Sequence, residues 1–175
     1  SLGGYHGAKL RRYQDLVDYR LEFELQDFIK KAQEGNYDWV STGTINMLNM
    51  KYLIAGAESN AVLENPEANG PAWVPSQLVP VGSNKEEMDK LGTIDTKTQA
   101  TINSKEFGAQ KAGAGKISLT KHAPNELTYR AEMTTAGLGV FSEIYYPAGW
   151  TAKLDGKEVP ILRTNYLLRG LQLPA

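Results

Sequence analysis

The first regular pattern in the chain is a helical alternation of apolar and polar residues over Arg12–Ala32. Apolar residues recur every three or four positions, which predicts one apolar stripe along an amphipathic helix. Charged residues such as Asp15 and Glu22 fall largely outside this stripe. Glu34-Gly35-Asn36 follows, and a glycine after the last periodic residue is a typical helix end. The stripe consists of Tyr13, Leu16, Val17, Leu21, Leu25, Phe28, Ile29 and Ala32.

Between Asp38 and Leu91 the pattern breaks into short pieces. Ser41 or Thr42 is a possible N-cap for a short helix, and Asn-Pro and Asn-Gly-Pro turns interrupt the stretch Glu58–Pro80. The expected elements are a helix through Ile45, Met47 and Leu48, a buried strand at Met50–Ile54 closed by Gly56, short strands at Ala72–Val74 and Leu78–Val81, and a helix at Asn84–Leu91.

After the Gly108–Lys116 loop the apolar residues recur with period two, as in half-buried strands. Leu138–Tyr146 is apolar on both faces, which predicts a central strand. Asp155-Gly156 is a strong signal for a two-residue hairpin. Further strands are expected around Ile117–Thr120, Leu127–Thr134, Trp150–Leu154, Val159–Leu162 and Tyr166–Leu173.

These elements predict one mainly β, α+β domain over residues 1–175. Its core is expected to be an antiparallel β-sandwich or jelly-roll-like layer with an N-terminal amphipathic helix. Three segments make it up: a helical opening with the first strand (1–57), a turn-rich middle (58–116) and antiparallel hairpins (117–175).

Composition narrows the class of function. The chain has 175 residues, with 19 Lys and Arg against 20 Asp and Glu, so its net charge of −1 argues against nucleic-acid binding. Cys is absent, which excludes disulfides, thiolate nucleophiles and Cys-ligated zinc. The apolar runs, such as Tyr52–Ala55, are too short to cross a bilayer. The chain has neither a natural start nor a natural stop, so we expect a piece of a larger protein.

Two motifs resemble ligand-binding sites but lack residues that such sites require. Gly113-Ala114-Gly115-Lys116 lacks the earlier Gly of a phosphate-binding loop, since Gln110 stands there, and Ile117 replaces the required Ser or Thr. His6 and His122 have no second ligand at metal spacing. We therefore expect no metal and no cofactor.

Glu143 is the one acid embedded in an apolar strand. A buried carboxylate must be paired or hydrogen-bonded, or its pKa rises. The simplest interpretation is structural pairing with an arginine on a neighbouring strand. The alternative is a glycoside hydrolase in which Glu143 acts with a carboxylate remote in sequence. The candidate partners are Arg130, Arg163 and Arg169.

Aromatic residues form the other candidate site. Tyr145, Tyr146, Trp150 and Tyr166 come from one set of hairpins, and Trp73 lies in the turn-rich middle. If exposed, such residues stack on sugar rings, and if buried they form the core of a small sandwich. The candidate glycan-binding residues are Trp150, Tyr145, Tyr146 and Trp73.

Three stretches carry a resemblance: Ser1–Leu10 with Arg12–Leu16, then Ile45–Ile54, and then Val140–Trp150 followed by Asp155–Lys157 and Asn165–Arg169. The most specific is Ser142-Glu143-Ile144-Tyr145-Tyr146-Pro147-Ala148-Gly149-Trp150. Together they resemble the C-terminal extracytoplasmic region of YfhO-like bacterial integral membrane proteins, in the form common among Bacteroidetes.

The resemblance implies a parent similar to GT-C-type glycosyltransferases that use polyprenyl-phosphate-linked sugars. Its catalytic acid would lie between the first membrane helices, so no catalytic residue carries over to this chain. The family pattern also runs past Ala175 into a further strand. The expected location is the periplasmic face of the inner membrane, and the expected partners are the rest of the parent and a cell-envelope glycan.

Three functions remain open. The first is an accessory domain that helps a membrane glycosyltransferase to hold its acceptor glycan. The second is a structural or protein-interaction module without a ligand of its own, working through a sheet edge or the helix Arg12–Ala32. The third is a hydrolase built on Glu143. Fold analogy alone does not choose among them.

Overall fold

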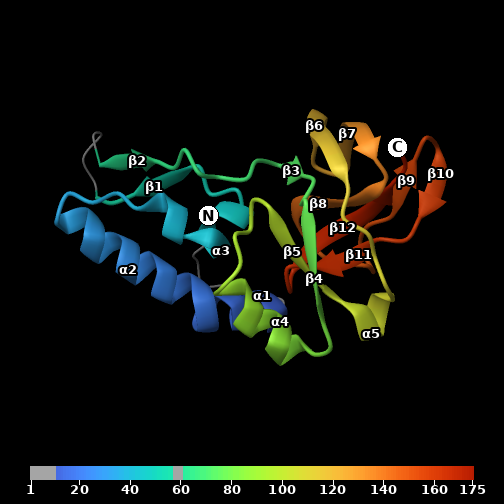
Figure 1. Ribbon diagram of the computed structural model, residues 1–175. Helices are drawn as coiled ribbons and strands as arrows, with labels where there is room; N and C mark the ends of the chain where they lie inside the picture. The colour runs from blue at the N-terminus through green and yellow to red at the C-terminus, as the bar shows by residue number, and fades with distance from the viewer. Residues whose placement is uncertain (1–10, 57–60) are drawn as a thin grey trace.

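The computed structural model describes residues 11–56 and 61–175 (Figure 1). It confirms the predicted class, because the described residues form several antiparallel sheets and include the predicted N-terminal helix. Predictions for Ser1–Leu10, including His6, and the boundary between 57 and 58 lie outside the described residues. Within the part described, no helix is both long and apolar enough to cross a bilayer.

The N-terminal helix is continuous but changes its winding. It comprises α1 (Arg11–Leu16), a π-helical turn η1 (Val17–Leu21) and α2 (Glu22–Gln33). The wider π turn keeps Leu16 and Leu21 on one buried face although they are five residues apart. The helix ends as predicted at Gly35, whose φ is +83°. Two hydrogen bonds close this end: Gly35 N–H to Ala32 O (3.0 Å) and Asn36 N–H to Lys31 O (2.9 Å).

The predicted short helix is α3 (Gly43–Met47), which follows the 3₁₀ turn η2 (Trp39–Ser41). Thr42 occupies the N-cap position, but its side chain does not cap the helix. The cap comes from α2 instead: the Glu24 carboxylate accepts hydrogen bonds from Thr44 N–H (2.8 Å) and Ile45 N–H (3.3 Å). A carboxylate at this end also suits the helix dipole.

The strand predicted at Met50–Ile54 exists, but its predicted burial is wrong. β1 (Tyr52–Ile54) pairs only with β2 (Val62–Glu64) in the described part of the chain, and Tyr52 and Ile54 are 59% and 74% exposed. A two-stranded ribbon can cover only one face. Leu53 and Leu63 use that face to pack against Leu21, Phe28, Trp39 and Ile45.

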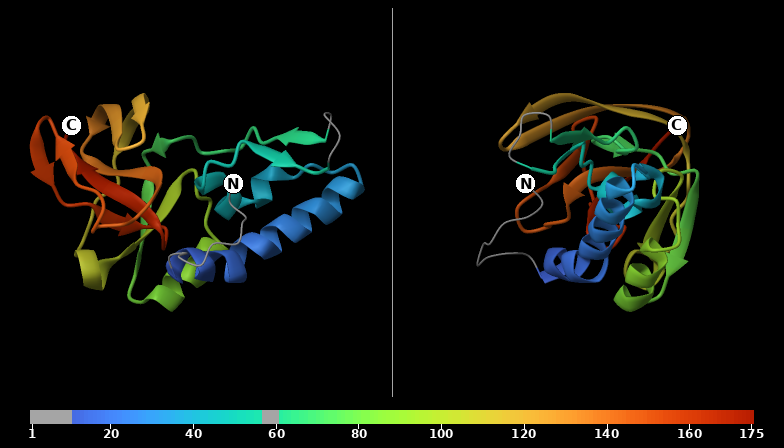
Figure 2. Two further views of the ribbon diagram at one scale, coloured as in Figure 1. Left: turned by 180° about the vertical axis from the view of Figure 1, so that it is seen from behind. Right: turned by 90° about the vertical axis from the view of Figure 1, so that its left-hand side faces the viewer.

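The main sheet has six strands in the order β3-β8-β12-β11-β5-β4. Figure 2 shows the strands of the C-terminal part gathered at one end of the molecule, with the long N-terminal helix extending away from them. β8 lies inside the sheet, paired with β3 and β12, as expected of a strand that is apolar on both faces. β4 and β5 are linked by α4 (Asn84–Leu91) and form the one parallel pair among the described strands. The strands are β3 (Ala72–Trp73), β4 (Gln77–Val81), β5 (Gln99–Asn103), β8 (Gly137–Ile144), β11 (Leu162–Thr164) and β12 (Leu168–Leu173).

The two faces of this sheet carry different layers. Helices α1, α3 and α4 contribute Leu16, Met47 and Leu91 to the larger core, which also holds Val140 and Leu168 of the sheet. The short helix α5 (Ser104–Phe107) adds Phe107 at its margin.

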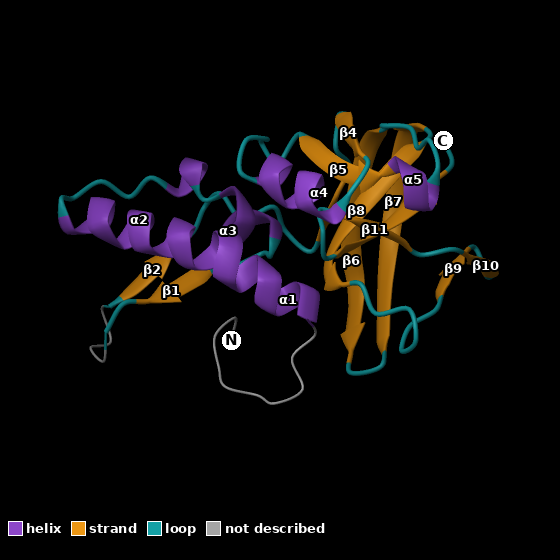
Figure 3. Cartoon of the chain, turned by 90° about the horizontal axis from the view of Figure 1, so that it is seen from below, coloured by secondary structure: helices purple, strands orange, loops and turns teal. Residues whose placement is uncertain are grey.

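Two hairpins form the layer on the opposite face (Figure 3): β6 (Ala114–Ala123) with β7 (Glu126–Thr135), and β9 (Ala152–Leu154) with β10 (Lys157–Val159). The turn of the second is the predicted Asp155-Gly156, with φ of +49° and +81°. Ile117, Phe141 and Leu173 form a small core between this layer and the sheet.

Candidate functional site

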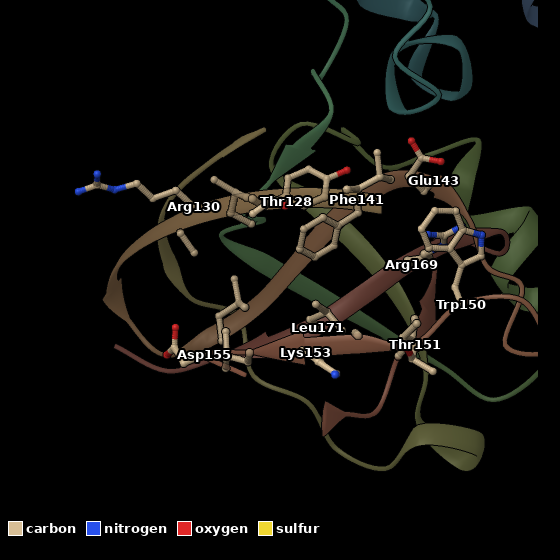
Figure 4. Close-up of a pocket in the computed structure, with 18 of the residues that line it drawn as sticks. Thr128, Arg130, Phe141, Glu143, Trp150, Thr151, Lys153, Asp155, Arg169 and Leu171 are labelled. Atoms are coloured by element: carbon tan, nitrogen blue, oxygen red, sulfur yellow. The ribbon is translucent and has the colours of Figure 1, made fainter. Parts of the chain in front are cut away.

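An open cleft of about 1000 Å³ separates the two hairpins of the second layer (Figure 4). β7 forms one rim and β9 the other, while β8 and β12 of the main sheet form the floor. The floor is apolar along much of its length because Phe141, Leu171 and Leu173 point into it. The cleft is therefore a gap in an otherwise continuous sandwich layer.

Both rims of the cleft are free strand edges. Within the described chain, β7 pairs only with β6 and β9 only with β10. The runs Asn125–Ala131 and Gly149–Asp155 line the cleft without a gap, so side chains from both faces of each strand border it. That is expected when a strand meets a cavity with its edge, because successive side chains point to opposite faces.

One end of the cleft holds an aromatic residue and two charged groups. The Arg169 guanidinium lies over the Trp150 ring, 4.4 Å from its centroid, and Arg169 Nε donates a hydrogen bond to Ile144 O (2.9 Å). Glu143 points to the same end from β8 (Figure 4). Burial lowers the pKa of Arg169, while the charge of Glu143 and the nearby Tyr129 raise it. This end of the cleft therefore presents the partly desolvated Arg169 cation, stacked on Trp150, beside the Glu143 carboxylate.

Tyr129 connects this end to the β7 rim. Its ring meets Phe141 edge-on, with centroids 4.8 Å apart and planes at 76°. Burial and the charge of Glu143 raise the pKa of Tyr129 to about 12, against a smaller lowering effect of Arg169. The phenol therefore stays neutral to a higher pH than an exposed tyrosine does.

The four aromatic residues predicted to bind glycan are spread over different parts of the fold. Trp150 lines the cleft, but Trp73 is buried in the larger core, with no hydrogen-bond partner for its indole nitrogen. Tyr145 contacts Phe107 of α5 edge-on, with centroids 6.4 Å apart. Tyr146 is exposed and its ring covers Gly149, where an added Cβ would lie 2.5 Å from it. They do not form one stacking platform.

The three arginines considered for Glu143 are distributed similarly. Arg169 shares the cleft with it and is coupled to it electrostatically. Arg130 forms an ion pair with Glu132 on its own strand, at 3.0 Å. Arg163 pairs with Arg169 across β11 and β12, but its guanidinium contacts Glu87 and Glu106. Of the three candidates, Arg169 is the neighbour of Glu143. The predicted burial of Glu143 is wrong, because its side chain borders the open cleft and is only half-buried.

Sequence reasoning missed the buried network around Arg163. Its Nη1 lies 2.6 Å from Glu87 Oε2, and Thr101 Oγ1 donates to the same carboxylate at 3.2 Å. Asn165 Oδ1 accepts from Thr101 N–H at 2.8 Å. Glu87 and Arg163 are 76 residues apart, so no local pattern signals the pairing. The network lies away from the cleft and joins α4 to the sheet.

The residues weighed as metal or phosphate ligands form no such site where the chain is described. No group of three potential His or carboxylate ligands occurs among these residues, and His122 is exposed on β6. Ala114 to Lys116 already belong to β6, so the glycine-rich segment leads into a strand rather than a helix.

Comparison of the chain with models of known protein families, with curated proteins and with solved structures finds no match.

Proposed function

We propose that this chain is a protein-interaction domain on the extracytoplasmic side of a larger bacterial membrane protein, similar to the YfhO-like family. The cleft between β7 and β9 is its binding surface. One observation carries the proposal: two free strand edges face each other across an apolar floor. Natural proteins usually cover or blunt such edges, because an exposed edge is a template for pairing with another chain.

The exposure of small apolar positions inside the cleft supports this proposal. Ala131 pairs with Ile117 in the β6–β7 ribbon, so the two side chains share the face that looks toward the sheet. Ile117 is buried, but Ala131 remains exposed and lines the cleft. A partner seated in the cleft would cover this position and the floor beside it.

The Trp150–Arg169 stack favours a second candidate, an accessory domain that holds an acceptor glycan. A half-buried indole beside a carboxylate and a guanidinium is a suitable place for one sugar ring. Titration with cell-envelope oligosaccharides tests this candidate. Trp150→Ala should abolish any shift in the NMR signals of Glu143 and Arg169, while Trp39→Phe, a change in the core remote from the cleft, should leave it intact.

Photo-crosslinking in the cells that produce the chain tests the interaction proposal. A photoreactive amino acid replaces Ala131 in the cleft or, as a matched control, the exposed Ala109, which does not line it. We expect adducts from position 131 only, in the membrane fraction, with a parent band well above 19.3 kDa. A soluble band near 19.3 kDa would contradict the membrane parent. Equal adducts from both positions would contradict the cleft as the interaction surface.

A further inference from the structure

We infer that the partner in the cleft is an extended polypeptide strand, which lies between β7 and β9 and pairs with both. It would convert two separate hairpins into one five-stranded layer over the main sheet. The inference rests on the proposed function and specifies its partner. A sugar polymer cannot satisfy two rows of backbone donors and acceptors in this repeating way, whereas a peptide strand does so residue by residue.

The directions of the two rims suit a single inserted strand. Thr128 and Arg130 follow one another along the upper rim of Figure 4 in the same direction as Thr151, Lys153 and Asp155 along the lower one. β7 and β9 therefore run the same way. One strand between them has the same relation, antiparallel or parallel, to both neighbours, so either orientation forms two equivalent ladders.

The apolar floor of the cleft determines which side chains suit an inserted partner strand. Alternate residues of an inserted strand would point down onto Phe141 and Leu171 of the floor, beside Ala131 of the β7 rim, and the residues between them would face solvent. The partner should therefore alternate apolar and polar residues over about five positions, the usual length of a strand.

The charges of the cleft indicate an occupant of low net charge. The cleft is lined by equal numbers of cationic and anionic side chains. The cationic ones are Arg130, Lys153 and Arg169, and the anionic ones are Glu126, Glu143 and Asp155. A densely anionic polymer gains no net attraction from such a surface. An uncharged strand meets no electrostatic repulsion from this surface and gains apolar contacts with the floor.

NMR titration of the isotope-labelled chain tests this inference. The probe is a synthetic capped peptide of alternating Val and Thr with Lys at one end and Glu at the other, so that its net charge is zero. The control peptide has the same sequence with alternate backbone nitrogens methylated, which removes the donors of one edge and keeps every side chain. We expect the first peptide to shift the amide signals of Glu126–Ala131 and Thr151–Leu154, and the methylated peptide to bind at least roughly tenfold more weakly.

A protein variant gives the matching control. Ala131→Phe adds a ring that projects from the β7 rim over the floor of the cleft. It should weaken peptide binding by roughly tenfold, because the ring occupies the space of the inward side chains of the peptide. Ala109→Phe adds the same ring at an exposed position outside the cleft and should leave the affinity unchanged. The amide spectra of both variants show directly whether they are folded.

Three outcomes would overturn the inference: no shifts in β7 and β9, equal binding of both peptides, or no effect of Ala131→Phe. Adducts from position 131 in cells together with any of these would leave the interaction function standing and reject a strand as its partner. If an uncharged oligosaccharide shifts the signals of Trp150 and Arg169 while the peptide does not bind, the cleft is a glycan site.

Discussion

Arg163 and Glu87 form an ion pair of 2.6 Å in which the side chains are only 1% and 0% exposed. The pair joins β11 to α4, and Glu106 brings a second carboxylate to the same guanidinium. Removing one member of such a pair leaves an uncompensated buried charge, which costs far more than the pair itself contributes. The network therefore fixes how α4 and α5 sit on the sheet.

Glu87→Ala should lower the free energy of unfolding by about 3 kcal/mol, the lower end of the cost of breaking a buried pair, because Arg163 would keep only Glu106, whose side chain is 46% exposed. Urea unfolding followed by circular dichroism measures the change. The control is Lys85→Ala on the same helix, where the Lys85–Asp89 pair is largely solvated. That change should cost less than about 0.5 kcal/mol. A similar decrease in the free energy of unfolding of the two variants would show that the buried pair is no more important for stability than the exposed one.

Glu24→Ala should destabilise the chain by about 1–2 kcal/mol, because Thr44 N–H and Ile45 N–H at the start of α3 lose their acceptor. Burial raises the pKa of Glu24, although these hydrogen bonds lower it in part. Glu22→Ala on the exposed side of α2 is the matched control and should change stability by a few tenths of a kcal/mol at most, roughly. Equal effects would contradict the capping role of Glu24.

Glu143→Gln should lower the pKa of Tyr129, which now lies at about 12, since the carboxylate charge opposes formation of the phenolate. Alkaline titration of tyrosinate absorbance, with Tyr129→Phe to identify the signal, measures the shift. An unchanged pKa would show that Glu143 and Tyr129 do not interact in the cleft.

Tyr129 should also make the fold sensitive to alkali. Its pKa is raised on folding, so the stability that it contributes is complete below the ordinary value of 10.0 and is lost as the pH rises to about 12. In urea unfolding at a series of pH values, Tyr129→Phe should flatten this alkaline decline. If the free energy of unfolding of Tyr129→Phe falls as steeply with pH as that of the unmodified chain, groups other than Tyr129 cause the decline.

Acrylamide quenching should distinguish Trp150 from the other two tryptophans. Trp39 is buried against Phe28, with ring centroids 3.9 Å apart, and Trp73 lies in the larger core, whereas Trp150 lines the open cleft. Trp150→Phe should therefore remove most of the quenchable fluorescence, and Trp73→Phe should remove little. The reverse pattern would contradict the placement of both residues.

Sequence patterns predict the elements whose signals lie within a few neighbouring residues. The N-terminal helix, its Gly35 end and the Asp155-Gly156 hairpin follow from spacing and turn chemistry within a few residues. β5 was not predicted, because Gln99–Asn103 is held by a parallel partner on one side and β11 on the other. The burial of β1 was predicted wrongly, since an apolar run does not show how many faces are covered.

The candidate site was only partly predictable for the same reason. Residue type points to Trp150, and an apolar strand context points to Glu143; both line the cleft. The cleft itself depends on where two hairpins stop short of each other, which no single segment encodes. The same aromatic pattern predicts a glycan site at Trp73 and Tyr145, yet long-range packing directs them to the larger core and to Phe107.

Hydrogen exchange tests the central claim, that a partner pairs with the free edges of β7 and β9, most directly. Amide exchange is measured by mass spectrometry in the isolated chain and in the native membrane fraction. We predict slower exchange in the fraction for Glu126–Thr135 and Ala152–Leu154, and an unchanged rate for the exposed ribbon strand Val62–Glu64. Equal rates in β7 and β9 in both samples would contradict the claim.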